Sequence, residues 1–196
     1  MPILDKFGNE IEHHIDFPKN LNIANIEFGA GKTNFGKREY PKCYLTDKNY
    51  PSELVLHFKN HIDYKNEDCH YLDDICDFFE YKFERKFENI ILCNPYKYGF
   101  YQLANAKKFF NRAGEILKAN GRIHIIKHSS NAWFSKKIIE NFFKTEIDDL
   151  KSIYDFELES FETLDTNHEI NIKYIFHQTG LNKTTVPNEK IVIKKL

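Results

Sequence analysis

Ile23-Ala24-Asn25-Ile26-Glu27-Phe28-Gly29-Ala30-Gly31 is the stretch that decides the fold of this chain. Its apolar run ends in an acid and closely spaced glycines, and twenty residues after Glu27 a second apolar run, Cys43–Thr46, ends in Asp47. A strand that leads into glycines, followed by a strand that ends in a carboxylate, is how an open α/β sheet holds an adenosine-containing cofactor. The glycines let the backbone approach a ligand, and the acid accepts hydrogen bonds from ribose hydroxyls.

Helix-like and strand-like patterns alternate beyond these two strands. Apolar spacing predicts helices over 51–59, 76–84, 100–118 and 133–143, and strands over 69–72, 87–93 and 122–127. Three further strand-like runs follow over 152–158, 170–176 and 190–195. We therefore expect an α/β fold with a mostly parallel sheet of about seven strands, helices on both faces and an antiparallel C-terminal hairpin.

Length and composition fit one ordinary domain. The 196 residues are 41% apolar and 15% aromatic, which is enough for a sizeable core without disulfides or metals. We expect a single domain over 1–196, with a lead-in (1–22), a cofactor-binding βαβ body (23–144) and C-terminal strands (145–196). The net charge of −1 gives no global signal for nucleic acid or membrane, and 1–17 lacks the apolar core of a signal peptide. We expect a soluble, cytoplasmic protein without a membrane partner.

The cysteines and histidines do not predict a metal site. Cys43, Cys69, Cys76 and Cys93 have no C-x-x-C spacing, and we interpret them as buried, reduced thiols. His57 and His61 stand four apart on a predicted helix but have no third ligand nearby. The aromatic residues of the last predicted helix have helical spacing, which favours a place in the core: Trp133, Phe134, Phe142 and Phe143.

The order of these motifs resembles the Rossmann-like S-adenosylmethionine-dependent methyltransferases over 23–176. Glu27-Phe28-Gly29-Ala30-Gly31 is similar to their E/D-x-G-x-G loop, Asp47 to their acid after the second strand, and Asp74-Ile75 to their adenine-contacting pair. Asn94-Pro95-Tyr96 stands where many of them carry an N-P-P-Y motif. Their third glycine would fall near Thr33, and the spacing between Gly31 and the second strand requires a short first helix.

A narrower resemblance links residues 90–127 to the ribosomal-RNA uridine-N3 methyltransferases. Their N-F-P-H-x-G loop is similar to the segment from Asn94 to Gly99, and their L-x-P-x-G-x-I-H segment and following lysine are similar to 117–124 and Lys127. The run Gly31-Lys32-Thr33-Asn34-Phe35 is also somewhat similar to that of adenine-N6 rRNA dimethyltransferases. Both resemblances imply methylation of a nucleobase, with RNA modification as the role.

The superfamily resemblance assigns the candidate site residues. Glu27, Gly29 and Gly31 would hold the methionine end of S-adenosylmethionine, Asp47 the ribose, and Asp74 with Ile75 the adenine. Asn94 and the Pro95 carbonyl would accept hydrogen bonds from an acceptor amine while Tyr96 stacks on the base, which makes these three the candidate catalytic residues. A uridine ring nitrogen would need a base instead, for which His128 and Tyr98 are candidates by position.

Local charge leaves the acceptor open. Ten Lys or Arg residues stand in 97–144 against two acids, and nine acids stand in 145–169 against one lysine. The basic segment could guide RNA toward the site, or its lysines could form solvated helix faces or pair with the acidic segment. Two alternatives to an RNA enzyme stay open: a small-molecule methyltransferase, and a catalytically inactive protein of this fold that binds or inhibits a protein partner.

Overall fold

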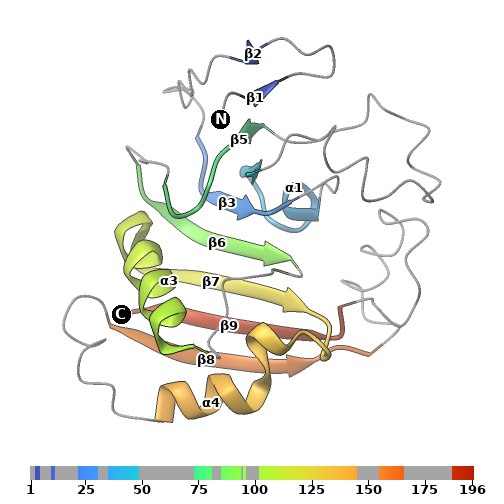
Figure 1. Ribbon diagram of the computed structural model, residues 1–196, viewed down its shortest axis with the longest axis vertical. Coiled ribbons are helices and arrows are strands. Elements are labelled where there is room, and N and C mark those ends of the chain that lie inside the picture. The colour runs from blue at the N-terminus through green and yellow to red at the C-terminus, as the bar shows by residue number, and fades with distance from the viewer. Residues whose placement is uncertain are drawn as a thin grey trace.

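Ten segments of the chain are described by the computed structural model: 3–4, 10–11, 22–30, 35–48, 73–80, 85–93, 95, 102–144, 155–165 and 187–196. Within them one seven-stranded sheet has the order β5-β4-β3-β6-β7-β9-β8 (Figure 1). Its strands are β3 (Asn25–Phe28), β4 (Cys43–Asp47), β5 (Asp74–Ile75), β6 (Phe87–Cys93), β7 (Leu117–Lys127), β8 (Phe156–Thr163) and β9 (Glu189–Lys195). A separate antiparallel pair joins β1 (Ile3–Leu4) and β2 (Glu10–Ile11).

The strand directions confirm the expected architecture. Strands β5, β4, β3, β6 and β7 run parallel, whereas β9 lies antiparallel between β7 and β8. The α/β class, the mostly parallel sheet and the antiparallel C-terminal strands are therefore confirmed. The predicted bounds of the strand over 87–93 match β6, in which residues 90–92 form a continuous apolar run because both faces of the strand are covered there.

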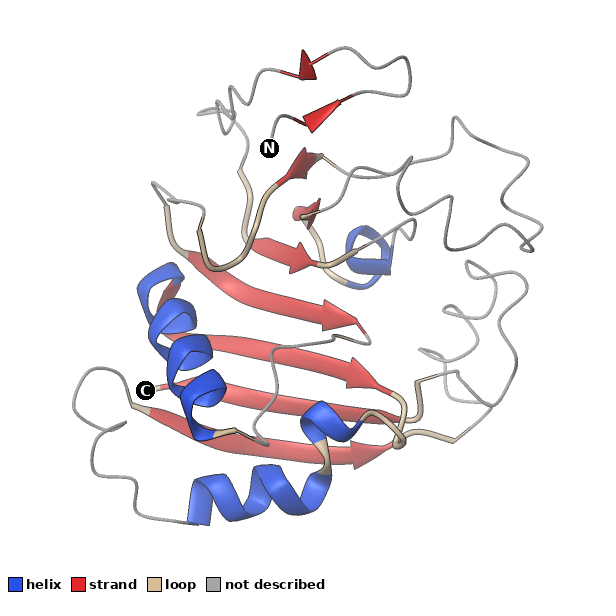
Figure 2. Cartoon of the chain, in the orientation of Figure 1, coloured by secondary structure: helices blue, strands red, loops and turns tan. Residues whose placement is uncertain are grey.

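Helices cover both faces of the sheet, as expected (Figure 2). On one face, Phe35 of α1 (Phe35–Glu39) packs with Leu45, Ile91 and Ile126. On the other, α3 (Leu103–Ile116) and α4 (Lys136–Lys144) pack over the alternate strand residues, with Phe109 among the fully buried side chains. Neighbouring residues of a strand point to opposite faces, so the central strands are buried on both sides.

The helix predicted over 100–118 is wrong at its C-terminal end. It ends at Ile116, because Leu117 is already extended and pairs with Phe87 of β6. The register then shifts before Arg122 pairs with Asn89, and the extra residues turn through Asn120, whose φ is +61°. Asn120-Gly121 therefore forms a kink inside β7, since asparagine tolerates the left-handed region.

Other predicted bounds also need correction. The helix over 133–143 is a short 3-10 turn, Ala132–Phe134, followed by α4. Of the helix predicted over 76–84, the described part forms a turn in which the Phe79 N–H donates to the Asp77 carboxylate. The third strand lies at Asp74–Ile75 rather than ending before Asp74, and the strand predicted over 152–158 is β8. The elements predicted over 51–59, 69–72 and 170–176 lie outside the described residues, as do His57, His61 and Cys69.

Aromatic packing confirms most of the predicted core. The Phe110 ring of α3 stacks on Phe142 of α4 at 5.3 Å and contacts Phe143 edge-on at 5.9 Å. Phe134 is fully buried, and the side chain of Trp133 lies outside the described part of the structure. Cys43 and Cys76 are buried free thiols, as expected, and burial raises the pKa of the Cys76 thiol to about 12.

Candidate active site

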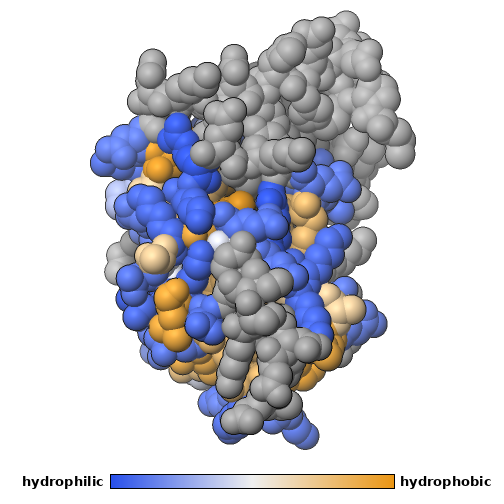
Figure 3. Space-filling view, turned by 90° about the vertical axis from the view of Figure 1, so that its left-hand side faces the viewer, coloured by the Kyte–Doolittle hydropathy of each residue, from blue (hydrophilic) through white to orange (hydrophobic). Residues whose placement is uncertain are grey.

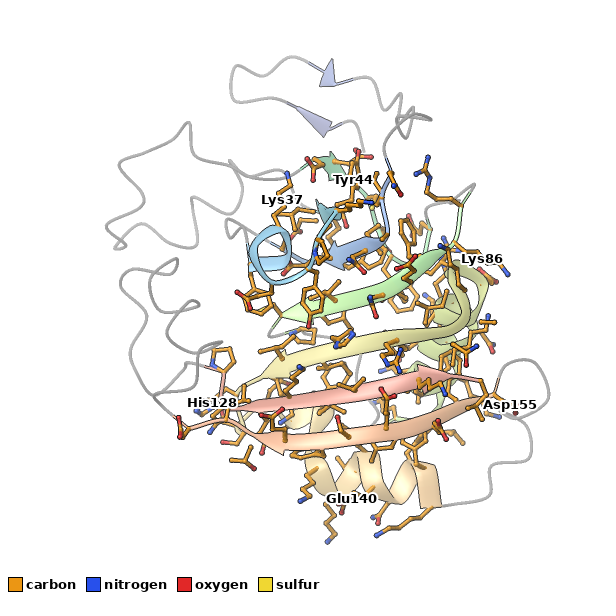
Figure 4. The ribbon with its side chains drawn as sticks, turned by 180° about the vertical axis from the view of Figure 1, so that it is seen from behind. Lys37, Tyr44, Lys86, His128, Glu140 and Asp155 are labelled. Atoms are coloured by element: carbon orange, nitrogen blue, oxygen red, sulfur yellow. The ribbon has the colours of Figure 1, made fainter. Side chains whose placement is uncertain are left out.

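Three carboxylates predicted to bind a cofactor lie at the carboxyl ends of three adjacent strands. Glu27 is the third residue of β3, Asp47 is the last residue of β4, and Asp74 begins β5 opposite Thr46. Lys37 and His128, labelled in Figure 4, lie toward this edge of the molecule, whereas Lys86 and Asp155 lie toward the opposite one. Parallel α/β sheets bind their ligands outside the carboxyl ends of their strands, so the predicted residues share the edge that such a site requires.

Glu27 is a fully buried acid with one oxygen in use. Its Oε2 accepts a hydrogen bond from the Gly36 N–H at 2.7 Å, whereas Oε1 is buried and accepts none from the described residues. Burial raises the pKa of the Glu27 carboxyl to about 8; the Gly36 hydrogen bond acts in the opposite direction, and the Asp47 carboxylate adds to the rise. The side chain therefore has a vacant acceptor position and a strong preference for a cationic or donor partner.

Gly36 is a glycine that the sequence analysis missed. A Cβ added there would lie 2.4 Å from Glu27 Oε2, 2.8 Å from Cys43 Sγ and 2.9 Å from a Leu45 methyl carbon. Close helix-to-strand packing is the role of the third glycine in dinucleotide-binding loops. Here it falls on Gly36 and not near Thr33, because α1 has only five residues and begins at Phe35. The prediction of a short first helix is confirmed by α1. The spacing of the glycines in the sequence could have indicated Gly36 as the third glycine.

The loop after β3 leaves room for a ligand. Gly29 has φ +71°, a conformation that favours glycine, and no atom of the described structure lies within 4 Å of a Cβ built on it. Its neighbour Ala30 donates its N–H to the Thr46 carbonyl at 3.0 Å, and the Thr46 hydroxyl donates to the Glu27 carbonyl at 2.8 Å. Open space at a left-handed glycine, beside a buried acid with a vacant oxygen, fits the amino-acid end of a nucleoside cofactor.

Asp73, beside the predicted Asp74, holds the neighbouring elements together. Its Oδ2 accepts the Leu45 N–H at 2.9 Å, and its Oδ1 accepts a hydrogen bond from Lys37 Nζ at 2.6 Å. The Asp47 carbonyl in turn accepts the Cys76 N–H at 2.9 Å. These bonds fix the ends of β4 and β5 against α1, so Asp47 and Asp74 occupy defined positions at the edge of the sheet.

Pro95 is the described member of the predicted acceptor loop. It is buried, and its carbonyl accepts a hydrogen bond from Asn131 Nδ2 at 2.8 Å. Asn131 was not singled out by the sequence analysis, because it lies 36 residues away and carries no motif. Gly31, Asn94, Tyr96 and Tyr98 lie outside the described residues, as does the side chain of Ile75. His128 is described, and its Nδ1 lies 2.7 Å from the Ser130 hydroxyl.

A chain of buried and partly buried polar side chains crosses the face that α1 covers. His124 Nε2 lies 3.0 Å from Asn89 Oδ1, Asn89 Nδ2 donates to Asn25 Oδ1 at 2.7 Å, and Asn25 Nδ2 donates to the Pro41 carbonyl. The pKa of His124 is lowered to about 4, mainly by burial and to a smaller extent by the nearby cations Lys190 and Arg122. The histidine is therefore neutral at physiological pH. This chain joins β3, β6 and β7: Asn25 and Asn89 face each other two residues before the pair of Glu27 and Ile91, whereas His124 lies opposite Ile91.

Half of the ten cations in the basic segment 97–144 are in ion pairs within the described structure. Five of its cations form ion pairs: Arg112 with Glu115, Lys118 with Glu88, Arg122 with Glu159, Lys127 with Glu189, and Lys136 with Glu140. Lys127 is fully buried, Lys118 is the second residue of β7, and Arg122 lies in the middle of that strand. Figure 3 shows the side of the molecule where the parallel strands begin; its described residues are mainly hydrophilic, with scattered hydrophobic ones. These three cations therefore do not form a track at the carboxyl edge.

Comparisons with known proteins identify the fold. The chain is similar to the 30S ribosomal A1408 methyltransferase from an uncultured bacterium, with a TM-score of 0.56 and 12% identity over 100% of this chain and 99% of that one. An S-adenosylmethionine-dependent methyltransferase from Clostridium acetobutylicum matches with a TM-score of 0.49, 12% identity and coverage of 87% and 83%. The N-methyltransferase NodS from Bradyrhizobium japonicum matches with a TM-score of 0.48, 9% identity and coverage of 88% and 85%. The full-length match shows the Rossmann-like methyltransferase fold.

No protein-family model and no curated protein sequence matches the chain. Within the described segments, His, Cys, Asp and Glu side chains form no group of three or more suited to a metal ion. The helices in those segments are also too short or too polar to span a bilayer. The geometry of the strand ends is therefore the basis for a functional assignment.

Proposed function

We propose that this protein is an S-adenosylmethionine-dependent methyltransferase that acts on a nucleobase in RNA. The observation that carries the proposal is the set of carboxylates on adjacent strand ends: Glu27 on β3, Asp47 on β4 and Asp74 on β5. They lie at the carboxyl edge of a sheet with the methyltransferase fold, beside a left-handed Gly29 with open space next to it. We assign Glu27, Gly29 and Gly31 to the methionine end, Asp47 to the ribose, and Asp74 with Ile75 to the adenine.

The cofactor supplies an electrophilic methyl group on a sulfonium, which moves to a nucleophile by in-line displacement. The protein has to align donor and acceptor, and alignment alone supplies much of the rate enhancement. Glu27 suits the donor side because its buried Oε1 can accept a hydrogen bond from the methionine ammonium, which would also lower the pKa of this carboxyl. On the acceptor side we assign Asn94, Pro95 and Tyr96, with the Pro95 carbonyl as a hydrogen-bond acceptor.

Two observations support RNA as the substrate class. The structure that matches over nearly the whole of both chains is named as a methyltransferase of the 30S ribosome. The fourth-strand region resembles the uridine-N3 rRNA methyltransferases, in a segment that the structure resolves into β6, α3 and β7. Flipped bases are held by hydrogen bonds to their edges and by stacking, which suits the residue types of Asn94, Pro95 and Tyr96.

Calorimetry with S-adenosylhomocysteine tests the cofactor assignment. We expect the wild-type protein to bind S-adenosylhomocysteine. Asp47→Asn should raise the dissociation constant roughly 10- to 100-fold, because hydrogen bonds to a charged group contribute about 1.5–3 kcal/mol. Glu157→Gln is the matched control, because Glu157 also loses only its charge but lies at the far end of the sheet, where it pairs with Lys194 at 3.7 Å. No binding by folded wild-type protein would remove the proposal.

A small-molecule acceptor is the second candidate. The pairing of Arg122 with Glu159 and of Lys118 with Glu88 favours it, since paired cations have less charge to offer a phosphate backbone. Transfer of a labelled methyl group to protein-free ribosomal RNA separates the two candidates. Transfer that weakens steeply as salt is raised supports the RNA substrate, whereas cofactor binding without transfer to RNA supports a small acceptor.

A further inference from the structure

The Pro95 carbonyl is held by a side chain from a different strand end. Asn131 Nδ2 donates to it at 2.8 Å, and Asn131 is only 7% exposed. Pro95 follows β6, whereas Asn131 follows β7, so this bond joins the ends of two neighbouring parallel strands. A buried amide-to-carbonyl bond has few competing water partners, so it sets the direction of the carbonyl strongly.

Asn131 is itself fixed by backbone bonds. Its N–H donates to the His128 carbonyl at 2.9 Å, and its carbonyl accepts the Phe134 N–H at 3.3 Å. Phe134 is fully buried and anchors this turn in the hydrophobic core. The side chain of Asn131 therefore starts from a backbone that is held on both sides.

A second layer of bonds ties the same turn to β9. Asn188 donates its N–H to the Lys127 carbonyl at 2.9 Å, and its Oδ1 accepts the Ser129 N–H at 2.7 Å. Lys127 is fully buried, and its ammonium forms an ion pair with Glu189 at the start of β9. The turn that carries Asn131 is thus attached to the ends of β7 and β9, and through Pro95 to β6.

We infer that Asn131 is a positioning residue that acts on the acceptor side of the site through the Pro95 carbonyl. The inference rests on the proposed function, in which this carbonyl accepts a hydrogen bond from the methyl acceptor. A carbonyl oxygen has two lone pairs, and among the described residues the bond from Asn131 occupies one of them. The peptide unit is planar, so fixing this carbonyl also fixes the plane that links Pro95 to the next residue.

The experiment compares two isosteric variants that each lose one amide donor bonded within the protein. Asn131→Asp removes the donor to Pro95, and the control Asn89→Asp removes the donor to Asn25 in the polar chain under α1. For each protein we would measure the dissociation constant of S-adenosylhomocysteine, amide hydrogen exchange in the peptide 94–99, and methyl transfer to protein-free ribosomal RNA. Hydrogen exchange reports on the acceptor loop without any need for activity.

We expect Asn131→Asp to lower kcat roughly 10- to 100-fold, because misplacement by about 1 Å has that cost, while the KM for S-adenosylmethionine stays within about twofold. Exchange in 94–99 should become roughly tenfold faster. The control Asn89→Asp should change neither kcat nor the exchange in 94–99, although it lowers the stability of the protein. Equal effects of the two variants on kcat and exchange would overturn the inference.

The outcome separates the inference from the proposed function. Absence of S-adenosylhomocysteine binding by the wild type refutes the proposed function, whereas normal binding with equal behaviour of the two variants refutes only the role of Asn131. Should Asn131→Asp fail to fold, Asn131→Ala removes the same donor without adding a charge, and Asn89→Ala replaces the control. The same comparison then decides the inference.

Discussion

Replacing Glu27 by glutamine should change how the stability of the protein depends on pH. The Glu27 carboxyl is fully buried, and burial raises its pKa to about 8, while an unfolded glutamate titrates near 4.5. Between these values the native state holds a proton on Glu27 that the unfolded state has released. The free energy of unfolding of the wild type therefore falls as pH rises through this window.

The size of the effect follows from the pKa difference. Each pKa unit corresponds to about 1.4 kcal/mol, so the change from about 4.5 to about 8 costs the wild type at most about 4–5 kcal/mol. Glutamine keeps a carbonyl oxygen for the Gly36 N–H but cannot ionise. Relative to the wild type, Glu27→Gln should therefore gain stability steadily from pH 5 to pH 8, by roughly 1 kcal/mol per pH unit.

Urea denaturation of both proteins at pH 5, 6, 7 and 8 measures the difference directly. Glu157→Gln is the control, because Glu157 is about half exposed and its curve should run parallel to that of the wild type. Parallel curves for Glu27→Gln and the wild type would refute the buried, protonated state of Glu27. Saturating S-adenosylhomocysteine should flatten the wild-type dependence, since the proposed ammonium partner stabilises the ionised carboxylate.

Three other perturbations test the fold and the site. Gly36→Ala should lower the free energy of unfolding by about 1–3 kcal/mol in urea denaturation, because its Cβ would lie 2.4 Å from Glu27 Oε2 and 2.8 Å from Cys43 Sγ. Lys195→Met should lower the free energy of unfolding by about 1–3 kcal/mol, because the buried Lys195 Nζ donates to the Gly114 and Leu117 carbonyls. An unchanged free energy of unfolding would show that these carbonyls find other partners. Asp73→Asn should weaken S-adenosylhomocysteine binding less than Asp47→Asn does in calorimetry, since Asp73 contacts Leu45 and Lys37 instead of the proposed ribose position.

Strands β3, β4 and β6 could be predicted from the sequence because each contains an apolar run with a polar end. β6 is bounded by Asn94-Pro95, and β4 ends in Asp47, so local composition and turn chemistry agree with the final fold. The carboxylates followed from the strands, since any residue at the end of a parallel strand comes to the same edge. Their arrangement on β3, β4 and β5 thus required no knowledge of tertiary contacts.

The residues that the sequence did not indicate depend on tertiary packing. Asn131 is defined by one hydrogen bond to a carbonyl 36 residues away, and no local pattern distinguishes it from another polar loop residue. Gly36 is needed because α1 packs closely against Cys43 and Leu45. Since α1 has only five residues and begins at Phe35, this close contact falls on Gly36 and not near Thr33. Leu117 has helical spacing but pairs with Phe87, because the contact with β6 outweighs the local helical preference.

The distribution of charge along the sequence differs from the distribution of charge in the folded protein, and this difference bears on whether RNA is the methyl acceptor. The sequence places a basic segment directly after Asn94-Pro95-Tyr96, yet Arg122 pairs bidentately with Glu159 across the sheet, at 2.7 and 2.8 Å. The acidic segment 145–169 thus neutralises part of the basic one, because β7 and β8 flank the single strand β9 and Arg122 reaches Glu159 across it. If RNA is the substrate, its phosphates must meet cations other than Lys118, Arg122 and Lys127. Arg122→Gln should therefore leave the salt dependence of RNA binding unchanged, whereas a slope smaller by about one would place that arginine in the RNA interface.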